Sequence, residues 1–180
     1  MNKYKTMSVL PWTKRRVFVI MATGLFERRP DMYRKILVPL DGSELSETVL
    51  DQVVNIGKGC RVPEVVLTRV RYPLDKNVEQ TLDAKIAVEL DEVYREEAEM
   101  YLKKVAADLE KQGLKVSNVV LSGNPAEEIL RYARENGVDL IVMSTHGRSG
   151  VPRLFFGSVA DKIVRHSDVP VLIKPPGHQV

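Results

Sequence analysis

The sequence predicts an α/β fold: a single doubly wound sheet of five parallel strands with helices on both of its faces. From residue 33 onward, short apolar runs alternate with stretches in which apolar residues recur at helical spacing, and strands that alternate with helices are typical of a parallel sheet. The run KILVPL (35–40) is continuously apolar, as expected for a strand that helices cover on both faces. A chain of 180 residues is long enough for one such domain with a sizeable core.

Two strands and two helices are predicted in the first half of the domain. The run KILVPL (35–40) is the first strand, and EVVLTRV (64–70) is the second. Between them Asp41-Gly42-Ser43 turns the chain, and Ser43 can cap a helix that ends at about Gly57–Gly59. A long helix is predicted over roughly 79–112, because apolar residues recur there at helical spacing: Ile86, Leu90, Val93, Tyr94, Met100, Leu102, Val105 and Leu109.

Three further strands and two helices complete the pattern. The strands are KVSNVVL (115–121), VDLIVM (138–143) and VPVLIK (169–174). Asn124 and Pro125 have the residue types of an N-cap and a first helical position, so a helix begins there and ends at Asn136-Gly137. A second helix covers SVADKIVRHS (158–167). Pro170 in the last strand indicates an edge position or the start of the strand.

Residues 1–31 are predicted to be an extension ahead of the domain, which spans 32–176 and leaves a tail at 177–180. Seven basic and one acidic side chain give residues 1–30 a net charge of +6, so with +3 for the whole chain the other 150 residues carry −3. The segment 14–30 has a basic cluster and an apolar run but no small-residue cleavage site, which disfavours an export signal. Two alternatives stay open: an upstream start codon ahead of Met32, or an extra strand or arm that packs on the domain.

Composition argues against several classes of function. A mildly acidic body is a poor electrostatic match for nucleic acid, and no stretch approaches the ~20 apolar residues that span a bilayer. The single cysteine, Cys60, cannot form an internal disulfide and fits a reducing compartment, so a cytoplasmic location is expected. The three histidines are scattered without the spacing of a metal site.

The loop STHGRSGVPRLFF after the fourth strand is the strongest candidate site, because ligands of open parallel sheets bind beyond the carboxyl ends of the strands. Gly147 and Gly150 let the backbone come close to a ligand. Gly157 and Ser158 open a helix, whose N–H groups and positive dipole end suit a phosphate. The alternative is structural: the glycines turn the loop, and Ser158 with Asp161 forms a capping box. The glycine spacings of Walker A and Rossmann motifs are both absent.

Gly147, nine residues and then Gly157-Ser158, after a strand of the VDLIVM type, resemble the signature of the universal stress proteins. That signature runs Gly, two residues, Gly, nine residues, Gly and Ser or Thr, and in ATP-binding members it cradles the triphosphate and ribose. The resemblance covers about 33–175, including MYRKILVPLDGS, GNPAEEI and SDVPVLIK, and departs at Ser144, where the signature has its first glycine. It implies a Rossmann-like fold of the adenine nucleotide alpha hydrolase type, and ATP bound with Mg²⁺ or Mn²⁺.

The resemblance also implies a role for each matching residue. Asp41 would lie near the adenosine or a metal, Val70 would offer its backbone to the adenine, and Met143 with Ser144 would edge the base and ribose. Alternatively, Asp41 is only a turn residue, Val70 is core, and Arg148 is a solvated loop residue. The implied site comprises Pro39, Leu40 and Asp41 after the first strand, Val70 in the second, Met143 and Ser144 after the fourth, and Gly147, Arg148, Gly157, Ser158 and Val159 around the phosphates.

No catalytic residue and no protein ligand to a metal is predicted. His146 has neither an orienting carboxylate nor a nucleophile near it in the sequence. The chain is therefore expected to bind ATP in a regulatory or stress-response role, with a slow ATPase and a nucleotide-free interaction protein as alternatives. The last strand is expected to lie at a sheet edge and to pair with its own copy across a two-fold axis, which makes a homodimer.

Overall fold

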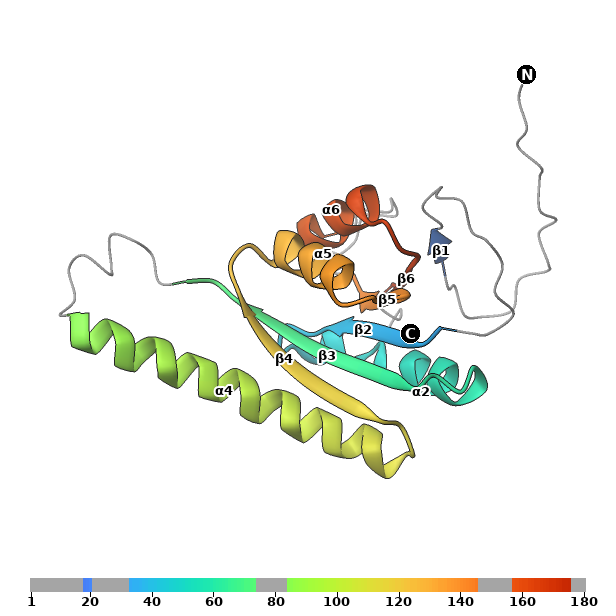
Figure 1. Cartoon of the computed structure of the whole chain (residues 1–180), viewed down its shortest axis with the longest axis horizontal. Coiled ribbons are helices and arrows are strands. Elements are labelled where there is room, and N and C mark those ends of the chain that lie inside the picture. The colour runs from blue at the N-terminus through green and yellow to red at the C-terminus, as the bar shows by residue number, and fades with distance from the viewer. Residues whose placement is uncertain (1–17, 21–32, 74–83, 146–156, 176–180) are drawn as a thin grey trace, which may run out of the picture.

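Six strands form one sheet in the computed structural model, which describes residues 18–20, 33–73, 84–145 and 157–175. Their order across the sheet is β1-β6-β5-β2-β3-β4 (Figure 1). Strands β2 to β6 run parallel to one another, which confirms the predicted sheet of five parallel strands. A further strand, β1, is antiparallel. The bounds are Phe18–Ile20 (β1), Lys35–Pro39 (β2), Glu64–Arg71 (β3), Val116–Ser122 (β4), Leu140–Ser144 (β5) and Val171–Lys174 (β6).

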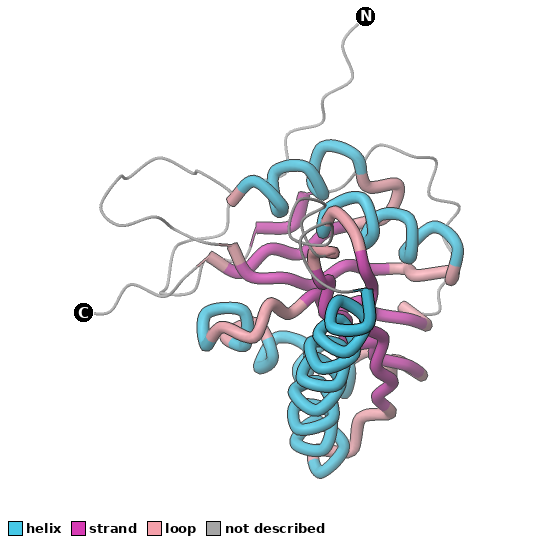
Figure 2. The backbone as a smooth tube through the Cα atoms, turned by 90° about the vertical axis from the view of Figure 1, so that its left-hand side faces the viewer, coloured by secondary structure: helices cyan, strands magenta, loops and turns pink. Residues whose placement is uncertain are grey.

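Helices cover both faces of the sheet, as predicted. α2 and α4 lie on one face, and α5 and α6 lie on the other (Figure 1, Figure 2). Successive residues of β3 point to opposite faces of the sheet: Val65 and Leu67 pack under α2 and α4, and Val66 packs under α5 and α6. None of the helices in the described ranges is long and apolar enough to cross a membrane. The helix bounds are Glu44–Glu47 (α1), Leu50–Gly59 (α2), Ala84–Lys111 (α4), Pro125–Glu135 (α5) and Ser158–His166 (α6).

Both predicted N-caps that precede acidic first turns are confirmed. The hydroxyl of Ser43 accepts a hydrogen bond from the N–H of Ser46 at 3.1 Å. The side-chain oxygen of Asn124 accepts one from the N–H of Glu127 at 3.4 Å, and Pro125 is the first residue of α5. Each cap satisfies one of the N–H groups that a helix start leaves without an intrahelical acceptor.

The helix predicted after Ser43 is two helices, α1 and α2. The N–H and the hydroxyl of Thr48 both donate to the carbonyl of Leu45, at 3.2 and 2.7 Å. A side chain that bonds to a preceding carbonyl competes with the regular helical ladder, and the chain starts a new helix at Leu50. Apolar periodicity does not register such a local break.

The prediction that the last strand lies at a sheet edge is wrong. β1 pairs antiparallel with β6, with Val19 opposite Leu172, so β1 holds that edge of the described sheet. Part of the N-terminal extension is therefore an extra strand on the domain, one of the two alternatives that the sequence left open. Pro170 precedes β6 and marks the start of that strand.

Candidate functional site

The carboxyl ends of three adjacent strands hold several of the predicted site residues. β5, β2 and β3 lie side by side, and the chain builds the sheet outward from β2 in both directions. In open α/β sheets a reversal of this kind opens a crevice in which ligands bind. Pro39 is the last residue of β2, Val70 is next to last in β3, and Met143 and Ser144 close β5. The structure therefore brings these four residues to one end of the sheet.

Asp41 forms the turn after β2. Its Oδ1 accepts hydrogen bonds from the N–H and the hydroxyl of Ser43, at 2.9 and 2.6 Å. Gly42 takes a positive φ of 89°, which favours glycine. The interpretation of Asp41 as a turn residue is thus confirmed. Asp41 is also exposed, at the carboxyl end of β2.

Three predicted site residues have core side chains. Leu40 is 3% exposed and packs under α2 and α4, and Met143 is 6% exposed and packs under α5 and α6. Val70 is half-buried against the second of these clusters. The N–H of Leu40 donates to the carbonyl of Thr68 at 2.8 Å, which ties the end of β2 to β3. These side chains position the backbone of the site.

Thr145 joins the two ends of the signature loop. Its hydroxyl accepts a hydrogen bond from the N–H of Gly157 at 3.1 Å, and its own N–H donates to the carbonyl of Lys174 at 3.2 Å. Thr145 is 6% exposed and the preceding Ser144 is 9% exposed. The start of α6 is therefore anchored at the carboxyl end of β5. Gly147 and Arg148 lie outside the described residues, as do His146 and Gly150.

The first turn of α6 carries no capping box, so that alternative is wrong. Gly157, with φ −56° and ψ 155°, holds the N-cap position and makes no side-chain cap hydrogen bond; Ser158 is the first helical residue and is exposed. Asp161 pairs instead with Arg165 at 2.8 Å. The hydrogen bond from Arg165 lowers the pKa of the Asp161 carboxyl. No N-cap side chain therefore satisfies the N–H groups of the first turn, and free N–H groups at a helix start suit an anion.

Thr68 adds a buried hydroxyl near the same end of the sheet. It is fully buried in β3 opposite Pro39 of β2, and its Oγ1 has no hydrogen-bond partner among the described residues. Its side chain lies on the face of Val66 and Val70, because alternate residues of a strand share a face. A buried hydroxyl without a partner is uncommon and costs about 1–3 kcal/mol. A polar ligand group at the strand ends would satisfy it.

A second polar group lies beside the Asp41 turn, on the face of α4. The Arg69 guanidinium stacks 5.3 Å from the centroid of the Tyr101 ring and reaches Glu97 at 3.5 Å. The Tyr101 hydroxyl donates to Glu47 at 3.0 Å, and burial, followed by this carboxylate, raises the pKa of Tyr101 to about 12. Sequence inspection missed Thr68, Arg69 and Thr145. Of these three residues, only Thr145 lies within the stretch that matches the family signature, so only Thr145 could have been selected from the sequence.

Protein ligands for a metal are not grouped in the part of the chain that the structure describes. No set of three or more His, Cys, Asp or Glu side chains there has the geometry to hold an ion. The donor set that the described residues offer at the site is instead the backbone N–H groups at the start of α6 and the hydroxyls of Ser158 and Thr68. Such donors fit an anionic, oxygen-rich ligand.

The family model of the universal stress proteins matches residues 32–175. The chain belongs to the universal stress protein family. Universal stress protein MJ0531 of Methanocaldococcus jannaschii is 32% identical over 166 residues, which cover 88% of this chain and 95% of that protein. Universal stress protein YxiE of Bacillus subtilis is 33% identical over 146 residues, 79% of this chain and 99% of the other.

Solved structures show the same architecture. The structure of MJ0577, described as a structure-based assignment of biochemical function, has a TM-score of 0.69 and 33% identity and covers 82% of this chain and 99% of its own. A universal stress protein solved in complex with cAMP has a TM-score of 0.59 and 20% identity, over 81% of this chain and 98% of its own, and so shares the fold. In the present chain, Ser144 stands where the signature has its first glycine. It lies opposite Lys174 in the pairing of β5 with β6.

Proposed function

We propose that this universal stress protein binds ATP at the carboxyl ends of β5, β2 and β3, in a regulatory or stress-response role in the cytoplasm. The observation that carries the proposal is the start of α6, which has no side-chain cap and which Thr145 holds against the end of β5. The triphosphate would bind the N–H groups of Ser158 and Val159 and the hydroxyl of Ser158. Gly147 and Arg148 of the signature would complete this cradle.

The adenosine would lie toward β2 and β3. The Thr68 hydroxyl can donate and accept a hydrogen bond and makes none with the described residues. The Val70 backbone and the Asp41 carboxylate lie at the same end of the sheet. Mg²⁺ or Mn²⁺ would be held mainly by the phosphate oxygens, whose charge it neutralises. The cAMP complex of a protein with this fold supports a nucleotide as the ligand class.

Mass spectrometry of small molecules released from the denatured protein tests the proposal, together with calorimetric titration of ATP in the presence of Mg²⁺. Saturable ATP binding that EDTA weakens is expected. Phosphate release by the purified protein would identify a slow ATPase. A chain that neither carries nor binds a nucleotide would be the nucleotide-free interaction protein instead.

A homodimer through β6 is a separate matter. The outer edge of β6 is paired with β1, so a second copy has to displace β1 before it can add its own strand there. The residues at issue, Val171 to Ile173, bond to β1 through the same backbone groups that a partner strand would use.

A further inference from the structure

The exposed apolar side chains of this protein gather on one helix. Among the described residues, six large hydrophobic side chains are exposed, and five of them belong to α4: Ile86, Val88, Val93, Tyr94 and Met100. Single exposed hydrophobic residues are ordinary, but contiguous apolar patches mark interaction sites. The clustering on α4 therefore indicates a surface that binds a partner.

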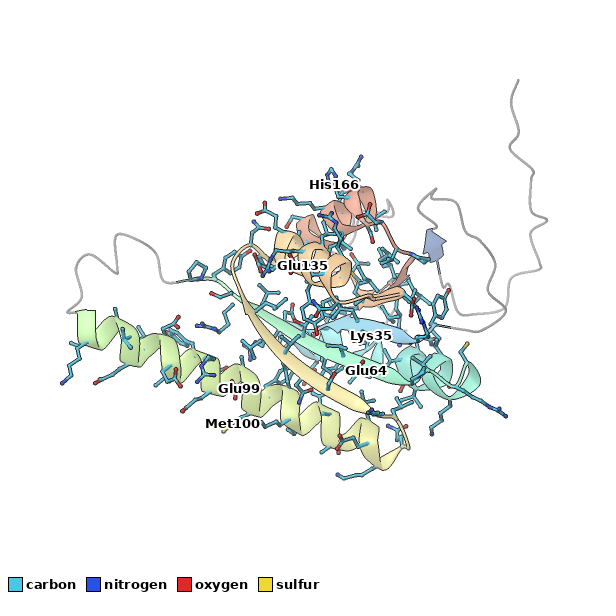
Figure 3. All side chains as sticks on the ribbon, in the orientation of Figure 1. Lys35, Glu64, Glu99, Met100, Glu135 and His166 are labelled. Carbon is cyan, nitrogen blue, oxygen red and sulfur yellow. The ribbon has the colours of Figure 1, made fainter. Side chains whose placement is uncertain are left out.

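Four residues of α4 form a straight seam, which we call the outer stripe: Ile86, Leu90, Val93 and Met100. They follow one another at steps of four, three and seven residues, the spacing of a coiled-coil seam. The inner face of the helix is a different set: Ala98, Leu102, Val105 and Leu109 are buried against the sheet. Figure 3 shows Met100 on the side of α4 that points away from β4. The apolar pattern that predicted this helix thus contains two faces, of which the sheet covers one.

The helix is also longer than its support. α4 has 28 residues, about 42 Å, whereas its neighbour β4 has seven, about 24 Å. Its N-terminal turns extend past the sheet in Figure 1. Arg71 braces this part through Asp91, with hydrogen bonds of 2.8 and 3.1 Å. A braced, projecting helix with an apolar outer stripe is suited to pack against another helix.

We infer that the outer stripe binds the same stripe of a second copy of this chain, with the two α4 helices antiparallel. A parallel pair would set Glu97 against Glu97 and Lys104 against Lys104, because both occupy seam positions. An antiparallel pair with Leu90 opposite the second copy's Met100 avoids both contacts. In this register Val93 faces the stem of Glu97, whose carboxylate Arg69 holds, and Ile86 faces the stem of Lys104.

Charge complementarity supports the antiparallel register. Glu89 and Lys103 are exposed and lie on the same flank of the stripe, fourteen residues apart. With Leu90 opposite Met100, each Glu89 lies beside the Lys103 of the other copy, so two attractive pairs form. Lys103 is 3.7 Å from Glu99 within its own helix, an exposed contact that it can exchange. Glu96 meets its own copy near the two-fold axis, the one like-charge contact of the arrangement.

Sedimentation velocity of the full chain measures the inferred assembly. A concentration-dependent dimer is expected, and Val93→Lys and Met100→Lys should each weaken it by at least ~10-fold. Val88→Lys is the matched control, since Val88 is 70% exposed on the same helix but lies off the stripe. A parent chain that stays monomeric at all concentrations overturns the inference, and so does an assembly that Val88→Lys weakens as strongly as Val93→Lys.

A charge exchange tests the register. Glu89→Lys and Lys103→Glu should each weaken the dimer at low salt, because each places like charges together twice. The double variant should restore it. An equimolar mixture of the two single variants should also dimerise better than either alone, because both charge pairs of its mixed dimer are Lys–Glu. Failure of the double variant to recover contradicts this register.

Thiol crosslinking gives a readout independent of affinity. In a Cys60→Ser background, Leu90→Cys mixed with Met100→Cys should crosslink through a short bis-maleimide, because these positions lie in one layer. Leu90→Cys alone should not, since the two copies of residue 90 lie about 15 Å apart along the antiparallel helices. Crosslinking of Leu90→Cys with itself would indicate a parallel pair and overturn the inference. All three experiments read assembly without nucleotide, so their failure leaves the proposed function untouched.

Discussion

The hydroxyl of Thr145 and the N–H of Gly157 share a hydrogen bond of 3.1 Å across the base of the signature loop. The two residues are twelve positions apart in sequence, and one ends a strand region while the other begins a helix. The bond therefore fixes where the opening turn of α6 lies relative to β5. A ligand held by that turn depends on this placement.

Replacement of Thr145 by Val should weaken ATP binding and lower stability together. Thr145 is 6% exposed, so Val fills the same space but leaves the N–H of Gly157 without its acceptor. Loss of one partner of a buried hydrogen bond costs about 1–3 kcal/mol. Thr145→Ser, which keeps the hydroxyl, is the control. Thermal melts and ATP titrations of both variants measure the effect. Equal melting temperatures and equal ATP affinities of the Val and Ser variants would show that the hydrogen bond contributes to neither.

Gly157→Val should weaken ATP binding at least ~10-fold, about 1.4 kcal/mol. The backbone at Gly157 is in an extended conformation that valine adopts readily, so the strand and helix should stay folded. The branched side chain would stand where the phosphates approach the helix. Calorimetry with ATP and Mg²⁺ measures the loss. Unchanged affinity would place the phosphates elsewhere.

Ser158→Ala should weaken ATP binding without a fall in melting temperature. Had Ser158 been the N-cap, its loss would cost about 1 kcal/mol of stability, but Gly157 holds that position and the Ser158 side chain makes no cap. The hydroxyl then serves only a ligand. A melting curve without nucleotide, beside a titration, separates the two effects; a drop in the melting temperature would return a structural role to Ser158.

The sequence predicted the elements whose signal is local and missed what depends on distant contacts. Apolar runs between turn signals identified all five parallel strands, most clearly for β2 and β5, whose central residues are buried by helices on both faces of the sheet. The pairing of Val19 with Leu172 was only one open alternative, since nothing local tells a three-residue strand where to pair. The Thr145–Gly157 bond and the orphan hydroxyl of Thr68 depend on neighbours that only the assembled sheet supplies. On α4, the apolar periodicity did not distinguish the residues that pack on the sheet from those that are exposed.

Asp91→Asn should destabilise the projecting half of α4, and the effect should vanish in acid. Arg71 is largely buried, and its hydrogen bonds lower the pKa of the Asp91 carboxyl below its ordinary value. A carboxyl whose folded pKa is lowered stabilises the fold above its unfolded pKa and loses this contribution as pH falls through the folded pKa. The parent should therefore be more stable than the variant at pH 7.

Melting curves of the parent and of Asp91→Asn between about pH 7 and pH 2 measure this difference. The two curves should converge as the pH falls through the lowered pKa of the Asp91 carboxyl in the folded parent, because the carboxyl is then protonated. Glu92→Gln is a control, because Glu92 pairs with Arg95 on the exposed side of the same helix and surface pairs contribute little. A constant gap between parent and Asp91→Asn at every pH would point to packing instead of charge.

Deletion of residues 1–31 should leave a cooperatively folded domain that self-associates through β6. The deletion removes β1 and keeps every residue of the two described core clusters, which begin in the sequence at Tyr33. It also uncovers the backbone groups of Val171 to Ile173, and a bare apolar edge invites strand pairing. Light scattering should give the shortened chain a larger assembly than the full chain. With Val93→Lys added, the shortened chain should still form a dimer. Leu172→Lys is unsuitable as a probe of the β6 edge, because Leu172 is 8% exposed within the core and its loss would unfold the sheet.

A shortened chain that melts without cooperativity would make β1 part of the folding unit. A shortened chain that folds but gains no assembly would show that the β6 edge needs no cover.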